Sequence, residues 1–423
     1  MPDIDTEAPD VPVLSSLHTT TLPLPPSCIA FVPRSRQWFV VGTYFLERGE
    51  EAEGQKRSGS LVLARLGEGE GRDVTITATH STPFAIFDLH FSPHETTAIT
   101  SSTSHLLGLA SSTGSVALYA IDPASPTAPI RHIRTLQLFP TTSLFTYFSW
   151  HPTIPLLAAA ALADGRVVLC DCSGNADDDE VDSRSRRIVT LHAHALEAWV
   201  TAFAPDGSAL FSGGDDAALK GGEQEEEGEE EEEDGDGAPQ FSPPWQWQDA
   251  RTHGAGVTFI LPLPQPYSPP TTTAPAPPLP PPDLLLTGSY DESLRLLSPP
   301  ARNGLGPRRS RVLAEIELGG GVWRIDVVDS SMAGPVVQGG DKEATAEAEW
   351  ILLVSCMHAG TRVLQAEGEW EWTWQFDVLA RFEEHQSMNY GSAVQPLRAG
   401  EAKKKRTVVS TSFYDRLVCV WEF

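Results

Sequence analysis

The sequence predicts an all-β protein, a closed β-propeller of seven blades, on three observations. Seven short apolar strands rich in small residues recur along the 423-residue chain, at residues 38–44, 106–111, 156–163, 210–214, 284–289, 351–356 and 408–412. The first four follow an aromatic residue that stands two positions before a proline. The 34 glycines and 35 prolines supply the turns that a many-stranded fold requires, and no amphipathic helical stretch of convincing length is present.

The last residues of the chain indicate the type of blade. Asp415 lies in a tight turn between two strands, where its short side chain can bond backbone N–H groups. Trp421, followed by Glu422, ends the next strand. An Asp followed six residues later by Trp and an acid is typical of a WD-repeat propeller blade. Because the sequence stops after this strand, we expect residues 14–22 to supply the outer strand of the last blade and to close the ring.

A propeller is one closed domain, so we expect a single domain over residues 14–423, preceded by a disordered N-terminus of residues 1–13. The repeats are longer than the roughly 40–45 residues typical of this family of blades. An acidic insert at residues 222–237 and a proline-rich insert at 262–282 account for part of the excess. The acidic run repels itself and the prolines stiffen the chain, so neither insert should contribute to the core.

The formal net charge of −27 disfavours direct binding of nucleic acid, because phosphates would be repelled. Five scattered cysteines argue against a disulfide framework, and no signal peptide is visible, so we expect a cytoplasmic protein. No apolar run reaches the roughly 18 residues of a membrane span. Cys170 and Cys172 have no second pair with which to complete a zinc site. We expect a monomer without metal or cofactor.

Catalytic motifs are few. No Gly-x-Ser-x-Gly elbow, phosphate-binding loop or His-Glu-x-x-His is present. In the last blade His385, Ser410 or Ser412, Asp415 and Trp421 match the buried hydrogen-bonded set of a WD-repeat blade, so a His–Asp pair here is first a structural device. Since propellers carry function in their loops, these features alone favour a protein-interaction scaffold.

Five motifs change this expectation: residues 212–221, 287–292, 319–324, 356–360, and His385 with 390–391 and 412–415. In this order they closely resemble the diphthine methyl ester hydrolase family, the WD-repeat enzymes of diphthamide biosynthesis. The resemblance extends from about His194 to Phe423 and is weak before that. Gly222 and Leu297 depart from the pattern, because a Trp would be usual at both positions.

The resemblance implies hydrolysis of a methyl ester on an over-methylated diphthine of translation elongation factor 2, which frees a carboxylate for amidation to diphthamide. Elongation factor 2 would be the protein partner. The family has also been labelled a methyltransferase, but the sequence shows no nucleotide-type methyl-donor pocket, which favours hydrolysis. Two further classes remain open, namely a non-catalytic WD-repeat adaptor and a substrate receptor for trafficking or ubiquitin ligation. Both predict binding without activity.

Ester hydrolysis needs a base, a nucleophile or activated water, and donors for an oxyanion. His358 and His385 are the candidate bases, and Cys356 is a possible nucleophile. His358 is favoured because its turn position is the least explained by the fold. His385 also fits the structural set of the last blade, and Cys356 fits a small core residue at a strand end.

The candidate substrate-binding residues lie in or beside the same motifs. Trp323 and Arg324 follow three glycines that allow a close approach, and Arg324 could meet the carboxylate or oxyanion. It could equally pair with an Asp of a neighbouring blade. The resemblance implies a quaternary trimethylammonium on the substrate, which aromatic faces and carboxylates would recognise. The candidates are Trp323, Tyr290, Tyr390 and Tyr414, with Asp291 and Asp415. The alternative is that the aromatic rings only pack between blades.

Overall fold

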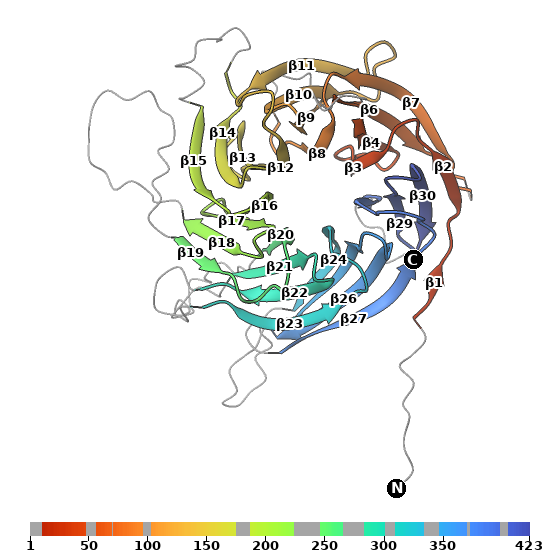
Figure 1. The fold of residues 1–423 in the computed structure, drawn as a ribbon. Helices are drawn as coiled ribbons and strands as arrows, with labels where there is room; N and C mark the ends of the chain where they lie inside the picture. The colour runs from red at the N-terminus through yellow and green to blue at the C-terminus, as the bar shows by residue number, and fades with distance from the viewer. Residues whose placement is uncertain are drawn as a thin grey trace, which may run out of the picture.

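The computed structural model is an all-β ring of seven blades around a central channel (Figure 1). In six blades, strands that follow one another in sequence pair antiparallel side by side, and the seventh takes its outer strand from the N-terminal segment. The first strand of each blade borders the channel and the last lies at the rim (Figure 1). The predicted fold class is therefore confirmed. The structure describes residues 11–47, 56–69, 71–95, 103–174, 187–223, 246–264, 283–300, 309–333, 347–369, 373–397 and 405–423.

The strands of the first four blades run in chain order. Blade 1 contains β3 (Pro26–Phe31), β4 (Trp38–Thr43), β6 (Arg57–Leu66) and β7 (Val74–Thr82), with the short β5 (Phe45–Leu46) paired to β6. Blade 2 contains β8 (Ile86–Phe91), β9 (His105–Ser111), β10 (Ser115–Ile121) and β11 (Ile130–Gln137). Blade 3 contains β12 (Phe145–Trp150), β13 (Leu157–Leu162), β14 (Arg166–Asp171) and β15 (Ile188–Ala193). Blade 4 contains β16 (Ala198–Phe203), β17 (Ala209–Gly214), β18 (Leu219–Glu223) and β19 (Gln246–Asp249).

The remaining blades complete the ring. Blade 5 contains β20 (Val257–Leu263), β21 (Leu284–Ser289), β22 (Ser293–Ser298) and β23 (Arg311–Glu317). Blade 6 contains β24 (Arg324–Ala333), β25 (Glu347–Ser355), β26 (Thr361–Glu369) and β27 (Trp374–Phe382). Blade 7 contains β28 (Gly391–Val394), β29 (Thr407–Thr411), β30 (Leu417–Glu422) and β2 (His18–Thr21). The seven strands expected from the sequence are the second strands of the seven blades.

The N-terminal segment closes the ring as expected. β2 pairs antiparallel with β30, with His18 opposite Val420 and Thr21 opposite Leu417. The short β1 (Val13–Leu14) adds a second contact, because it pairs in parallel with β27 of blade 6. The two ends of the chain are thereby joined through one sheet, which removes an exposed strand edge from blade 7.

The small residues of the second strands let neighbouring blades approach closely. A Cβ atom on Gly213 would lie 2.5 Å from the Val257 side chain of blade 5, and one on Gly288 would lie 2.5 Å from that of Val322. The alanines of β13 are fully buried for the same reason. The apolar side chains on the two faces of a blade pack against the blades on either side of it. These contacts between blades form the core.

The described structure bears only on the edges of the two expected inserts, and these edges differ from the sequence boundaries. Gly222 and Glu223 end β18, and Pro262 and Leu263 end β20, so these residues belong to strands because their backbones pair with neighbours. Residues 224–245 and 265–282 lie outside the described residues. Val13 is paired within β1, although the sequence assigned it to a disordered N-terminus, of which residues 1–10 are not described.

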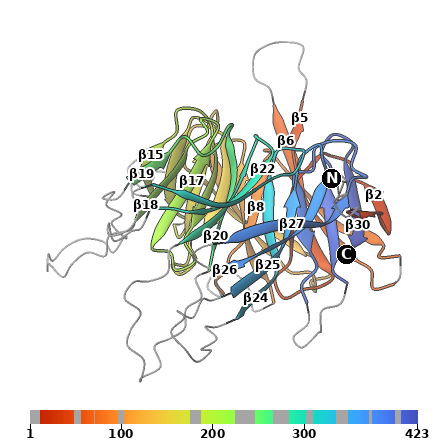
Figure 2. The same ribbon diagram turned by 90° about the horizontal axis from the view of Figure 1, so that it is seen from below.

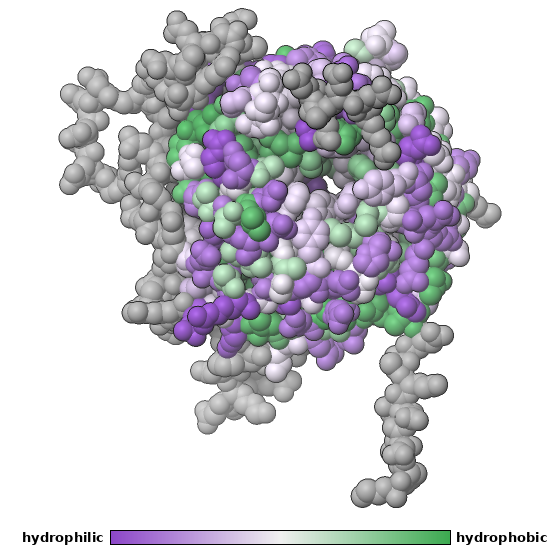
Figure 3. Space-filling model, viewed as in Figure 1, coloured by the Kyte–Doolittle hydropathy of each residue, from purple (hydrophilic) through white to green (hydrophobic). Residues whose placement is uncertain are grey.

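The β5–β6 hairpin projects beyond one end of the ring (Figure 2). The space-filling view shows a face on which hydrophilic and apolar side chains are mixed, without one dominant apolar patch (Figure 3). Within the described part of the chain, no helix has the length and apolar character needed to cross a membrane.

Candidate functional site

Several histidines belong to hydrogen-bonded sets inside the blades. In blade 7 the His385 Nε2 atom lies 2.8 Å from the Ser410 hydroxyl, to which the Trp421 indole donates at 2.9 Å. In blade 4 the His194 ring lies 2.8 Å from both Asp216 and Ser212. These sets fix the loop before the first strand to the second strand, so their role is structural.

A continuous series of aromatic rings, here named the aromatic arc, surrounds one mouth of the channel. Trp199, Tyr290, Trp323, Tyr390, Phe413, Tyr44 and Phe87 lie in contact from ring to ring, with centroids 4.9–6.2 Å apart. Phe87 and Trp199 occupy irregular positions near the start of β8 and β16, while Trp323 and Tyr390 directly precede β24 and β28. Since all first strands start at the same end of the ring, these residues share one face.

Carboxylates accompany the arc. The Trp199 indole donates to Asp215 at 3.3 Å. Burial raises the pKa of Tyr290 above its ordinary value, and Tyr390, Asp215 and Glu197 raise it further. A face of aromatic rings with nearby acids is suited to a large, weakly hydrated cation, which is attracted by ring faces and by negative charge. Tyr290, Trp323 and Tyr390 lie together in the arc.

The three glycines before Trp323 pack against the turn that carries His358. A Cβ atom on Gly320 would lie 2.3 Å from the Cys356 carbonyl oxygen, and one on Gly321 would lie 2.8 Å from the Met357 sulfur. Only glycine allows this approach, so the turn of residues 356–360 adjoins the arc. The His358 side chain itself is exposed. Within the described residues no hydrogen bond or ion pair orients its ring.

Arg324 extends across the channel from blade 6 to blade 2. Its Nη2 atom pairs with the Asp88 carboxylate, and the Tyr147 and Phe259 rings lie 5.1 and 5.5 Å from its guanidinium carbon. Asp88 is 1% exposed, and its second oxygen lies 2.7 Å from His90 Nε2. The sequence alternative of an Arg–Asp pair is therefore observed, with an Asp from across the channel rather than from an adjacent blade.

Arg324, Asp88 and His90, here named the Arg324 layer, stabilise one another's charges. Burial alone would raise the pKa of Asp88, but Arg324 and His90 hold it below its ordinary value. Burial would likewise lower the pKa of Arg324, and the Asp88 carboxylate raises it instead. Both side chains are therefore charged near neutral pH, and the guanidinium is held in one place before any ligand arrives.

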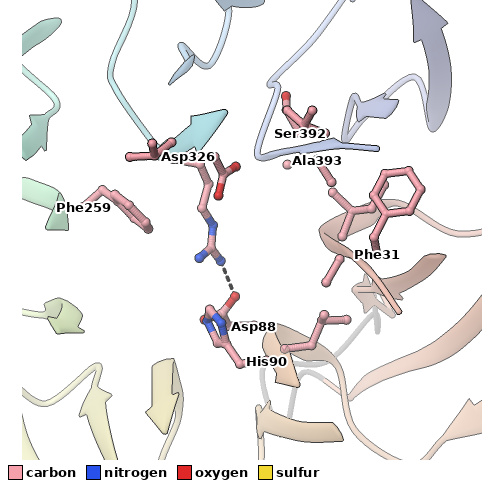
Figure 4. Close-up of a pocket in the computed structure, with 14 residues that line it drawn as sticks. Phe31, Asp88, His90, Phe259, Asp326, Ser392 and Ala393 are labelled. Atoms are coloured by element: carbon pink, nitrogen blue, oxygen red, sulfur yellow. Dashed lines mark hydrogen bonds and ion pairs between the residues drawn. The ribbon is translucent and has the colours of Figure 1, made fainter. Parts of the chain in front are cut away.

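A cavity of about 290 Å³ adjoins Arg324 (Figure 4). Its lining includes Phe31, His90 and Val394 near the ends of first strands, whereas the arc lies where these strands start, so the cavity and the arc are on opposite sides of Arg324. Its polar lining comes from Asp88 and His90 on β8, Arg324 and Asp326 on β24, and Ser392 on β28. Phe31 and Phe259 contribute aromatic walls (Figure 4). Asp326 is exposed to the water of the channel. The strands packed around it still desolvate the carboxylate enough to raise its pKa to about 6, a change that Arg324 and His90 oppose.

The structure places the remaining predicted site residues in the blades. Cys356 is fully buried, its thiol donates to the Val354 carbonyl oxygen at 3.6 Å, and burial raises its pKa to about 12. A thiol that stays protonated at neutral pH is a poor nucleophile. Burial lowers the pKa of His385 to about 4, and its ring is engaged with Ser410. Neither environment favours a catalytic role.

The two predicted acids act as turn caps. Asp291 accepts from the backbone N–H groups of Gly254 and Ser293 and pairs with Arg295 at 2.8 Å. Asp415 accepts from the Gln386 N–H at 3.0 Å and from the Ser387 hydroxyl at 2.9 Å. Tyr414 is 70% exposed, and its ring packs edge-on against Phe413 with the centroids 5.0 Å apart.

Sequence reasoning missed Asp88, His90, Asp326, Trp199 and Phe87. The sequence does contain a signal for Asp88 and His90. They alternate in an otherwise apolar first strand, which places two ionisable groups on its channel face. All five cysteines are free and buried. Among the described residues, no group of three or more His, Cys, Asp or Glu side chains is arranged to hold a metal ion.

Comparison with solved structures supports the fold. A chain of the mitotic checkpoint complex is 13% identical and superposes with a TM-score of 0.54, covering 100% of this chain and 98% of its own. Chaetomium thermophilum Sqt1, bound to the N-terminus of ribosomal protein L10, is 13% identical with a TM-score of 0.52, covering 94% and 97%. At this identity the likeness concerns the propeller alone.

Sequence comparison is more specific. Residues 185–220 match the model of the WD domain, G-beta repeat. The diphthine methyltransferase of Schizosaccharomyces pombe is 27% identical over 90% of this chain and 90% of its own length. That of Homo sapiens is 23% identical, over 84% of this chain and 69% of its own. The chain is therefore a WD-repeat β-propeller whose sequence relatives include proteins named diphthine methyltransferase.

Proposed function

We propose that this protein acts in diphthamide biosynthesis, as a cytoplasmic hydrolase of the methyl ester of diphthine methyl ester on translation elongation factor 2. The products are diphthine and methanol. The relatives' name supports the pathway, and the motifs around Trp323, His358 and Tyr390 resemble those of the diphthine methyl ester hydrolases. No cofactor is needed for this reaction.

The observation that carries the proposal is the juxtaposition of Trp323 and Arg324. Trp323 belongs to the aromatic arc, and the next residue extends into the channel as a guanidinium fixed by Asp88. The proposed substrate carries a quaternary ammonium and an ester on one side chain. Its site therefore needs aromatic faces and a positively charged hydrogen-bond donor close together, and these two residues provide both.

Binding of the ester beside Arg324 would favour the transition state over the substrate. As water adds to the carbonyl carbon, negative charge develops on the carbonyl oxygen. A guanidinium that is already oriented stabilises that charge without reorganising at the moment of reaction. His358 is the base that the sequence favoured, and it lies on the turn beside the arc.

The proposal is tested with purified protein and elongation factor 2 that carries the methyl ester. Mass spectrometry should show loss of one CH₂ group from the modified histidine, together with stoichiometric methanol, without any added methyl donor. Methyl transfer, as in the relatives' name, would instead add mass and require a donor. Stable binding with an unchanged mass would favour the non-catalytic adaptor.

A further inference from the structure

Among the described residues that line the cavity, His90 is a histidine whose ring a buried carboxylate orients. It follows Asp88 by two residues on β8, so both side chains point to the channel face of the strand. The Asp88 carboxylate accepts from His90 Nε2 at 2.7 Å. In the neutral imidazole this bond places the proton on Nε2 and leaves Nδ1 as an acceptor. A carboxylate that fixes the tautomer of a histidine is a recurring feature of general bases.

The surroundings of His90 suit work on a water molecule. Its side chain is 32% exposed and lines the cavity of about 290 Å³ (Figure 4). At about 30 Å³ each, several waters fit in this volume. Asp326 lines the same cavity, and none of the described residues forms a hydrogen bond with its carboxylate. The cavity thus combines a base and a second carboxyl group beside Arg324.

We propose that His90 is the general base of the ester hydrolysis and that it acts from the cavity side of the Arg324 layer. This inference rests on the proposed function and deepens it. The substrate's cation lies on the aromatic arc, its ester carbonyl lies at Arg324, and the attacking water comes from the cavity. Asp88 is a positioning residue, because it holds both the imidazole and the guanidinium.

His90 Nδ1 accepts a proton from water while the water oxygen forms a bond to the carbonyl carbon, and the carbonyl oxygen becomes an oxyanion beside Arg324. The oxyanion then re-forms the carbonyl, the bond between carbon and the methoxy oxygen breaks, and the His90 imidazolium gives its proton to the leaving group. Methanol leaves. The acid product releases a proton to the Asp326 carboxylate and from there to solvent.

The other candidate bases are less well placed. His358 is exposed without an orienting partner among the described residues, and burial lowers the pKa of His385 inside blade 7. A plainer explanation for His90 is that it only supports the Arg324–Asp88 pair. A glutamine at this position separates the two, because its amide can still donate to Asp88 but cannot take a proton from water.

The test compares kcat and KM of His90→Gln with those of the parent, His358→Gln and His94→Gln. His94 is the matched control, since its ring bonds the His151 carbonyl oxygen at 3.0 Å outside the cavity. His90→Gln should lower kcat roughly 10²-fold or more with KM nearly unchanged, while His94→Gln keeps the parent kcat and His358→Gln loses far less than His90→Gln. Thermal melts establish that each variant is folded.

A folded His90→Gln that hydrolyses the ester at the parent rate overturns the inference and leaves the proposed function intact. Loss of activity in His358→Gln alone moves the base to the rim of the channel. A parent protein without hydrolysis overturns both. Asp326→Asn provides a second measure if His90→Gln fails to fold. It should lower kcat about tenfold, whereas Asp329→Asn further along β24 should not, and equal rates for these two variants would contradict the proton route.

Discussion

Arg324 on β24 and Asp88 on β8 form an ion pair across the channel, although 236 residues separate them in the sequence. Tyr147 and Phe259 flank the guanidinium, and His90 completes the hydrogen bonding of the carboxylate. Four blades therefore meet at one charged group. Burying such a pair costs desolvation free energy that its attraction only partly offsets, so retaining it suggests a role other than stability.

The first prediction separates stability from function at this pair. Asp88→Ala leaves the guanidinium buried without its partner and should lower the free energy of unfolding by roughly 3–5 kcal/mol. The double replacement Arg324→Met with Asp88→Leu removes both charges and should unfold at nearly the parent urea concentration, yet lack hydrolysis. A double variant that keeps activity would show that the pair only joins the blades.

The second prediction concerns recognition of the cation. Trp323→Ala removes a ring near the centre of the arc and should weaken substrate binding by roughly 1–2 kcal/mol, the scale of a desolvated cation–π contact. Trp323→Phe retains an aromatic face and should recover most of the affinity. Calorimetric titration with the esterified factor measures both. Equal affinity of the parent and the alanine variant would place the cation elsewhere.

The third prediction follows from the carboxyl group in the cavity. The pKa of Asp326 in the folded protein is raised to about 6, so the folded state binds the proton more tightly than the unfolded state does. The contribution of this group to the free energy of unfolding therefore falls as the pH rises toward about 6 and stays reduced above it. Asp326→Asn cannot ionise, so this loss of stability with rising pH should be absent in the variant.

Urea denaturation at several pH values checks this sign. The asparagine variant should be more stable than the parent at slightly alkaline pH, and the difference should shrink as the pH falls below the ordinary pKa of an aspartate. The opposite trend, with the variant losing stability at alkaline pH, would mean that the carboxylate is paired in the folded protein.

The fourth prediction concerns the inserts. Removing residues 224–237 and 265–281 together should leave hydrolysis unchanged and shift Tm by less than about 2 °C, because these segments are too acidic or too rich in proline to bury a core face. As a control, a deletion that continues into β20 should abolish folding. A large loss of stability with the strands intact would show that the inserts pack on the ring.

The fold was predictable because each blade repeats a local pattern. The second strands are recognisable as apolar runs with small residues. Gly213 and Gly288 show why the residues are small, because the next blade approaches too closely for a larger side chain. Closure by β2 followed from a blade that lacked one strand. Most of this information is local, since strands adjacent in sequence are also adjacent in most sheets, whereas β2 reaches β30 from the other end of the chain.

The candidate site was only partly predictable, because its contacts join distant blades. The motif around Trp323 and Tyr390 indicated part of the aromatic arc, but Trp199 and Phe87 enter it through positions near the start of their own strands. Nothing local to Arg324 identifies Asp88 as its partner. The ring closure brings them together, and that geometry depends on how seven blades share one axis.

Hydrolysis in water enriched in heavy oxygen tests the central claim most directly. The account predicts that the parent protein, supplied with esterified elongation factor 2 and no methyl donor, releases unlabelled methanol and places one heavy oxygen in the new carboxylate. This outcome identifies water as the source of the new carboxylate oxygen and the bond between carbon and the methoxy oxygen as the one that breaks. An ester that stays intact, or a gain of methyl groups that depends on an added donor, would contradict the account.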